Sequence, residues 1–178
     1  MASATTPRWI RAGGGADAFT FSIVHVEGGS EEPLIVQDVL RGWSRRGGES
    51  PELVGVVREI ADICHTYNVR QTIGDRYAAG WVRQSFRAER ITYVESKLTK
   101  AEAYIESLAL FSQGRIQILD HPQLIRELQC LERRTRTGGK DIVDHPRGGH
   151  DDFSNVLCLA AAEEAARKRR PRAGIATA

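Results

Sequence analysis

The chain has 178 residues, of which 41% are hydrophobic and 27% are charged. This length and composition indicate one globular domain with a sizeable core, and they exclude an intrinsically disordered chain. No apolar run approaches the length of a membrane-spanning helix, and the first residues lack the apolar core of a signal peptide. We therefore expect a globular protein that does not bind a membrane.

The formal net charge of +2 is small, but the basic residues are unevenly distributed. One group precedes the last apolar stretch, and a second forms a tail over residues 167–172. Such clusters predict surfaces that attract anions, including nucleic acid. The first group consists of Arg133, Arg134, Arg136, Lys140 and Arg147.

The three cysteines are Cys64, Cys130 and Cys158, and they are far apart in the sequence. Each lies within a helical pattern, and none belongs to a C-x-x-C motif. This favours small buried side chains in a reducing compartment over disulfides or a structural metal site.

The first clear element is a strand. Residues 1–12 show no clear period, and the glycine run at 13–15 predicts a break in the chain. Residues 18–26 alternate, with Phe19, Phe21, Ile23 and His25 on one face. A polar turn and a second strand at 34–40 follow, so we expect an antiparallel pair.

The period then becomes helical. Ser50 and Pro51 predict an N-cap and a first helical turn, and an apolar stripe continues to about Tyr67. Residues 69–74 read as a strand that ends beside Asp75. A helix is predicted at 78–88, and a short strand at 91–94 is followed by Glu95.

A capping box opens the next helix, because Thr99 is followed three residues later by Glu102. Gly114 closes that helix, residues 115–119 predict an edge strand, and Pro122 begins a further helix. The apolar residues expected inside the two helices are Ala101, Tyr104, Ile105, Leu108 and Phe111 in the first, and Leu124, Ile125, Leu128 and Leu131 in the second.

Residues 133–145 predict a β-hairpin with a Gly-Gly turn, a basic first strand and too little apolar character for the core. Strands and helices in this order indicate an α/β fold with a mixed sheet. In such a sheet Asp75 ends a parallel strand, at the edge where ligands usually bind.

The last helical pattern begins in the run GGHDDFSN at residues 148–155. A glycine turn there delivers His150, Asp151 and Asp152 to a helix N-terminus. One acid is sufficient to cap the helix, so the other is a candidate metal ligand or acid–base group. The alternative is that both acids form an ordinary helix start.

Asp75, Glu95 and the Asp151–Asp152 pair are the acids that this layout can bring to one end of the sheet. Divalent cations prefer clustered carboxylates, and a pair of such ions can activate water and hold a phosphodiester in line. The basic hairpin would neutralise DNA phosphates. Alternatively, Asp75 caps a turn, Glu95 is solvated and the arginines form an ordinary wet surface.

The run KDIVDHPRGGHDDFSN at residues 140–155, with Gly74-Asp75 and residues 14–20 upstream, resembles the C-terminal nuclease domain of phage large terminase subunits. The resemblance extends from about Gly13 to Arg167. It implies an RNase H-like fold and a metal-dependent endonuclease that cuts concatemeric double-stranded DNA during packaging, with two Mg²⁺ or Mn²⁺ ions. It divides the chain into an atypical N-terminus (1–12), the nuclease domain (13–167) and a basic tail (168–178).

The same resemblance implies partners and a location. DNA would be contacted mainly through its backbone, and the protein partners would be the terminase ATPase motor domain, the small terminase subunit and the portal. The location would be the cytoplasm of the host cell. No phosphate-binding loop of the form G-x-x-x-x-G-K-[ST] occurs in the sequence, so we expect the nuclease half alone.

Matched to the family, Asp75 corresponds to the acid at the end of the fourth strand, and Asp151 and Asp152 correspond to the acidic pair at the final helix. Asp152 is the favoured metal ligand, with Asp151 beside it and His150 as an accessory residue. Some members have a further acid three residues on, where this chain has Asn155, a weaker neutral ligand.

The first strand departs from the family pattern. The family has Asp-Pro-Ser/Gly before the glycine run, and the expected Asp falls at about Ile10, flanked by Arg11 and Ala12. Either the native N-terminus was cut or replaced, or this copy has lost the acid, and Asp17 is a candidate substitute. Three functions stay open: a terminase nuclease of impaired activity, an inactive DNA-binding or motor-docking module of the same fold, and a resolvase-type RNase H-like nuclease.

Overall fold

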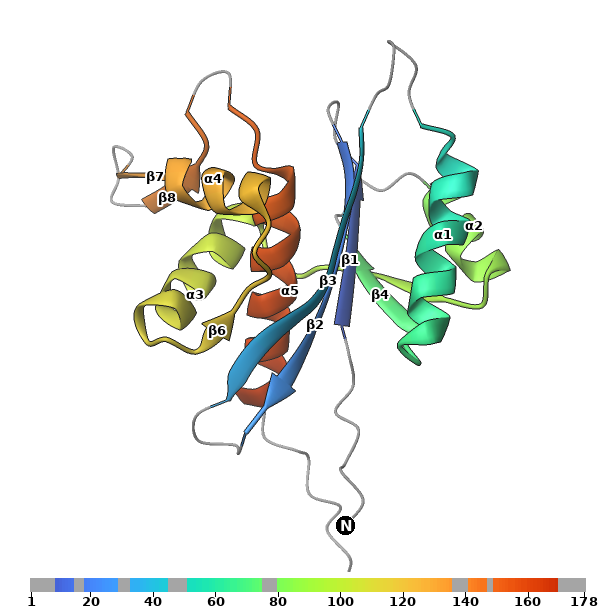
Figure 1. Cartoon of the computed structure of the whole chain (residues 1–178), viewed down its shortest axis with the longest axis horizontal. Coiled ribbons are helices and arrows are strands. Elements are labelled where there is room, and N and C mark those ends of the chain that lie inside the picture. The colour runs from blue at the N-terminus through green and yellow to red at the C-terminus, as the bar shows by residue number, and fades with distance from the viewer. Residues whose placement is uncertain are drawn as a thin grey trace, which may run out of the picture.

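The computed structural model describes residues 9–14, 18–28, 33–44, 51–74, 80–135, 141–146 and 149–169. A central sheet separates two helical layers (Figure 1). One face carries α1 (Leu53–Thr66) and α2 (Gly80–Ala88), and the other carries α5 (Asp152–Arg169). Two further helices, α3 (Lys100–Ser112) and α4 (Pro122–Cys130), pack on α5.

The sheet has six strands in the order β5-β4-β1-β2-β3-β6. Among them, β2 is antiparallel to both of its neighbours, and the other pairings are parallel. The mixed α/β sheet and the antiparallel β2–β3 pair are therefore confirmed. The strands are β1 (Trp9–Gly14), β2 (Ala18–Glu27), β3 (Leu34–Ser44), β4 (Gln71–Gly74), β5 (Thr92–Glu95) and β6 (Ile116–Gln117).

β1 lies in the middle of the sheet, between β2 and β4. The predicted break at the glycine run is wrong in its position, because the strand continues through Gly14, which pairs with Phe19. The sequence of this central strand, WIRAGG, contains no acid.

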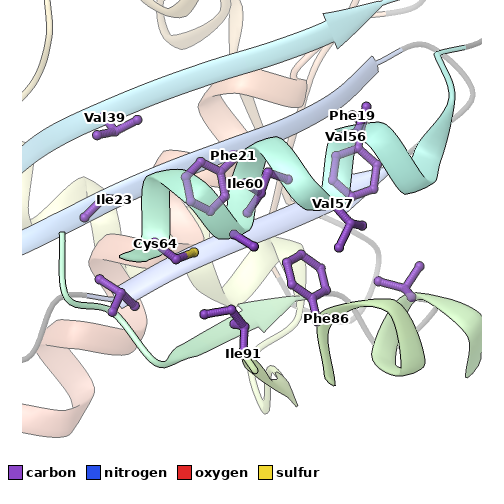
Figure 2. Close-up of a cluster of buried hydrophobic side chains, with 13 residues drawn as sticks. Phe19, Phe21, Ile23, Val39, Val56, Val57, Ile60, Cys64, Phe86 and Ile91 are labelled. Atoms are coloured by element: carbon purple, nitrogen blue, oxygen red, sulfur yellow. The ribbon is translucent and has the colours of Figure 1, made fainter. Parts of the chain in front are cut away.

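The α1–α2 side holds a large apolar core (Figure 2). The alternation predicted for β2 places Phe21 and Ile23 in this core, both fully buried. They meet Ile60 and Cys64 of α1, and Cys64 is buried as expected. The helix itself starts later than predicted, at Leu53 with Glu52 as the N-cap, and Ser50 lies outside the described residues.

On the opposite side, α5 is enclosed by the sheet and by α3 and α4. Its sequence is apolar on most of its circumference, which is typical of a buried helix. Three consecutive alanines, at positions 160–162, are all buried and allow neighbouring elements to approach.

The capping box of α3 is confirmed, because Thr99 accepts from Glu102 N–H and the Glu102 carboxylate bonds Thr99 N–H. The predicted apolar stripe is wrong in part: Ile105 and Leu108 are 41% and 47% exposed. The buried side includes Ser107, whose hydroxyl donates to the Cys158 carbonyl at 2.9 Å. Small and polar residues therefore face α5, because the two helices pack closely there.

The predicted hairpin is confirmed as β7 (Glu132–Thr135) paired antiparallel with β8 (Asp141–Asp144). It is not wholly polar, because Val143 is buried against Tyr104 and Cys158. In α4 the expected Leu131 is the C-cap and is partly buried, packed against the cluster of Tyr104, Val143 and Cys158. Cys130 is exposed, contrary to the expectation of three buried cysteines. Within the described ranges, none of the helices is long and apolar enough to cross a bilayer.

Candidate metal centre

Three neighbouring strands reach the same end of the sheet at the start of α5. Thr20 of β2 pairs with Gly13 of β1, and Ala12 pairs with Gly74, the last residue of β4. Since adjacent strands lie about 4.8 Å apart, Thr20 and Gly74 are separated by roughly 10 Å. The Thr20 hydroxyl donates to the Asp152 carbonyl at 3.1 Å, which holds the start of α5 at this end.

A glycine allows α5 to approach the sheet so closely. Gly42 of β3 pairs with Thr20, and a Cβ at position 42 would lie 2.3 Å from Cζ of Phe153. The Phe153 ring also stacks on His121, the N-cap of α4, with centroids 4.9 Å apart. Any larger residue at position 42 would require the Phe153 ring to shift.

The N-terminus of α5 is capped by a residue that the sequence did not single out. Ser154 N–H donates to Oε2 of Glu127 at 2.8 Å, and Gln123 of α4 donates to Oε1 at 3.2 Å. Glu127 is 6% exposed, and burial raises its pKa although the Ser154 N–H opposes the shift. Its charge lies where the helix dipole favours an anion. The sequence did contain a signal for this cap: Glu127 lies three residues after Leu124, and so on the same, buried face of the helix.

Asp151 was expected to help cap the helix, and it does so only through its backbone, whose carbonyl accepts from Asn155 N–H at 2.8 Å. Its buried carboxylate is bound by the Tyr104 hydroxyl at 2.9 Å and by Lys100 Nζ at 2.6 Å. Burial, together with the negative charge of Asp151, raises the pKa of Tyr104. Asp151 is thereby tied to α3.

Asp152 is the first residue of α5 and is half-buried, and Asn155 follows one helical turn later. The Oδ1 atom of Asn155 is buried and has no hydrogen-bond partner among the residues that the structure describes. A buried oxygen without a donor is costly unless a cation satisfies it. Asp152 and Asn155 therefore offer, one helical turn apart, oxygen atoms of the kind that divalent cations prefer as ligands.

A second group of ligand atoms lies beside it. One ligand atom each from Asp144, His145 and Asp151 lies within 4.8 Å of the other two. Asp144 and His145 were not among the sequence candidates, although an acid and a histidine in succession at a strand end were a visible signal. Lys100 Nζ contacts both carboxylates of this group, at 2.7 Å from Asp144 and 2.6 Å from Asp151.

The remaining predicted site residues are bound elsewhere, are exposed or fall outside the described ranges. Glu95 reaches the same end of the sheet beside Gly74, but its carboxylate is bound by Arg83 of α2 at 2.6 Å, on the side away from α5. His150, Arg133 and Arg134 are exposed, and Arg134 pairs with Glu132. Five predicted residues lie outside the described ranges: Asp17, Asp75, Arg136, Lys140 and Arg147.

Phage large terminases are among the solved structures that are similar to this chain. The large terminase nuclease from thermophilic phage G20c aligns with a TM-score of 0.71 and 16% identity over 89% of this chain and 82% of that chain. Its magnesium-bound form aligns with a TM-score of 0.71 and 17% identity, over 90% of this chain and 83% of that chain. The HK97 bacteriophage large terminase aligns with a TM-score of 0.73 and 14% identity, over 89% of this chain and 39% of that chain.

No protein-family model and no curated protein matches the sequence. The chain therefore has the RNase H-like fold of phage large terminase nuclease domains, which confirms the resemblance at the level of the fold. It spans about two-fifths of the HK97 terminase.

Proposed function

We propose that this chain is the nuclease domain of a phage large terminase and that it hydrolyses double-stranded DNA with Mg²⁺ or Mn²⁺. The observation that carries the proposal is the anchoring of Asp152 to β2 by Thr20, at the sheet end where β4 finishes before Asp75. The fold supports it, because the similar G20c nuclease has been solved with bound magnesium and with bound cobalt.

Asp152, Asp75 and Asn155 would hold the ion, with Asp151 beside them and Asp17 as a further candidate. When bound, a divalent cation supplies an activated water and neutralises charge on the phosphate. The residues of this chain orient that chemistry: Thr20, Phe153 and Glu127 fix the first turn of α5, and α3 holds Asp151.

DNA would lie along the β7–β8 hairpin. Arg133 and Arg134 are exposed on β7, and Arg136, Lys140 and Arg147 are close to them in sequence. Contacts from such residues to phosphates are independent of sequence and weaken as salt is added. In the full-length terminase the ATPase motor domain, the small subunit and the portal would be the protein partners, in the cytoplasm of the host.

The test is plasmid cleavage in Mn²⁺ and in Mg²⁺. Asp75→Ala and Asp152→Ala should each reduce cleavage to background, because each removes a ligand oxygen. Asp62→Ala, which removes an exposed acid of α1 on the opposite side, should leave cleavage unchanged and serves as the matched control. Unchanged cleavage in both site variants would overturn these assignments.

The absence of an acid from β1 predicts weak activity, and restoring one tests that idea. Ile10 pairs with Ile23, which belongs to the apolar core under α1, whereas Arg11 pairs with Ser22, two residues from Thr20. Since position 11 lies opposite Ser22 in the register, near Thr20, Arg11→Asp should raise cleavage more than Ile10→Asp does. If neither variant raises cleavage, the lack of an acid in β1 does not limit the activity.

The second candidate function is a DNA-binding or motor-docking module without catalysis, and the acid-free β1 favours it. This function predicts no cleavage with either metal, but salt-dependent DNA binding. Replacing Arg133, Arg134 and Arg136 by alanine should reduce the slope of log affinity against log salt by about one for each lost phosphate contact. Metal-dependent cleavage that Asp152→Ala abolishes would exclude this function.

A further inference from the structure

Lys100 is the first residue of α3, and its ammonium lies between two carboxylates from other elements. Nζ is 2.7 Å from Oδ1 of Asp144, the last residue of β8, and 2.6 Å from Oδ2 of Asp151, the residue before α5. One positive charge is therefore shared by two negative charges. The contact joins α3, the base of the β7–β8 hairpin and the N-terminus of α5.

The group that surrounds this ammonium has the composition of a cation site. One ligand atom from each of Asp144, His145 and Asp151 lies within 4.8 Å of the others. His145 Nδ1 is 2.8 Å from the Pro146 carbonyl, an acceptor, so Nδ1 carries the hydrogen and Nε2 holds the lone pair in the neutral ring. Two carboxylates and one imidazole nitrogen are suitable ligands for a transition-metal ion.

The ammonium is well held. Burial disfavours the charged form of Lys100, but the hydrogen bonds to Asp144 and Asp151 outweigh this effect, so its pKa is raised above the ordinary value. Burial likewise tends to raise the pKa of Asp144, yet the Lys100 ammonium outweighs it and the pKa is lowered. Each group stabilises the charge of its partner, and the Lys100 ammonium is a permanent cation at neutral pH.

We propose that Lys100 is a positioning residue whose tethered ammonium takes the place of a metal ion in the Asp144–His145–Asp151 group and holds the β7–β8 hairpin on the N-terminus of α5. Metal is thereby kept out of this group, and the basic strand of the hairpin is set at a fixed distance from Asp152. The inference does not depend on the proposed nuclease function, since its tests measure the amount of bound metal and the protease sensitivity of the hairpin, and not DNA cleavage.

The first test is Co²⁺ binding to the full chain, followed by visible absorption and equilibrium dialysis. Lys100→Met should bind one Co²⁺ per chain more than the unaltered protein, because it frees two carboxylates and one imidazole nitrogen. The gain should vanish in Lys100→Met/Asp144→Asn. Lys100→Arg keeps a cation in place and should bind no additional Co²⁺.

The second test is the rate at which trypsin cuts the intact chain within the basic run at 133–140. Lys100→Met should raise this rate on the order of tenfold, because a side chain coupling three elements has been removed. Lys97→Met is the matched control, since it removes an exposed lysine from the preceding loop, and it should not change the rate.

Two outcomes would overturn the inference. The first is a Lys100→Met protein that binds no additional Co²⁺ and is cut at the original rate. The second needs no change at Lys100: if Asp144→Asn alone lowers the Co²⁺ bound by the otherwise unaltered chain, the group already holds metal beside the lysine. An unaltered stoichiometry in Asp144→Asn supports the inference even if Lys100→Met does not fold.

Discussion

The two sides of the sheet are built differently. Under α1 and α2 the buried residues are mainly apolar, from Phe19 to Ile91 (Figure 2), although Thr72 is also buried there beside Tyr93. On the α5 side the buried residues include acids and hydroxyls that bond across elements: Tyr104, Ser107, Glu127, Asp151 and Ser154.

This difference separates stability from positioning. Burial of apolar surface stabilises the fold but has no direction, so it cannot orient a carboxylate. Hydrogen bonds are directional, and unmade ones are costly in the interior. The α1–α2 side therefore supports the sheet, whereas the α5 side fixes the Asp151 carboxylate and the first turn of α5, which carries Asp152 and Asn155.

The largest expected effect on the apolar side is that of Phe21→Ala. The side chain is fully buried, so its loss should cost about 3–5 kcal/mol of unfolding free energy in urea titrations. Leu53→Ala on α1 is the control, because Leu53 is 38% exposed, and its loss should be far smaller. Folded Phe21→Ala protein should bind divalent metal as the unaltered chain does; weakened binding would contradict the separation of the two sides.

On the α5 side, Glu127→Ala should lower the unfolding free energy by about 2–3 kcal/mol, because it leaves the backbone N–H groups of Ser154 and Phe153 without their acceptor. Unlike Phe21→Ala, it should also weaken Mn²⁺ binding, measured by calorimetry, since the first turn of α5 carries the proposed ligands. Glu127→Gln keeps an acceptor oxygen, so it should lose less unfolding free energy and less Mn²⁺ affinity than Glu127→Ala. Equal losses in the two variants would show that the negative charge, and not the hydrogen bond, holds the turn.

The approach of α5 to the sheet is tested by Gly42→Ala. The added methyl would meet the Phe153 ring, so we expect a loss of about 1–2 kcal/mol in the same urea titrations. Gly80→Ala is the matched control, because a Cβ there meets nothing within 4 Å and Gly80 begins α2. A Gly42→Ala protein as stable as the control would mean that Phe153 moves aside without cost.

The smallest expected effect concerns pH and the hairpin. The folded state lowers the pKa of Asp144 below 3.8, so the unfolded state binds more protons as the pH falls through that value. The stability contributed by Asp144 is therefore present above pH 3.8 and is lost as the pH falls toward the lowered pKa. Asp144→Asn should reduce the acid-side decline in urea midpoint between pH 6 and 3, whereas Asp62→Asn on α1 should not.

Local patterns determined much of the fold from the sequence. Alternation identified β2, and the capping box identified the start of α3, because each signal acts within a few residues. The β7–β8 hairpin was also predicted, but its expected Gly-Gly turn lies outside the described residues. The same reasoning failed for the side of α3 that is buried, since close packing against α5 selects Ala103 and Ser107 over Ile105 and Leu108.

For the site, the sequence by itself determined that the acids at 151 and 152 begin the last helix and that β1 contains no acid. Only the tertiary structure decided how those acids are held. Lys100 and Tyr104 bind Asp151 from positions about fifty residues away, and Glu127 caps the helix from α4. Spacing along the chain reports neighbours within a helical turn or a strand, whereas the partner of a buried charge is chosen by elements that meet only when the chain folds.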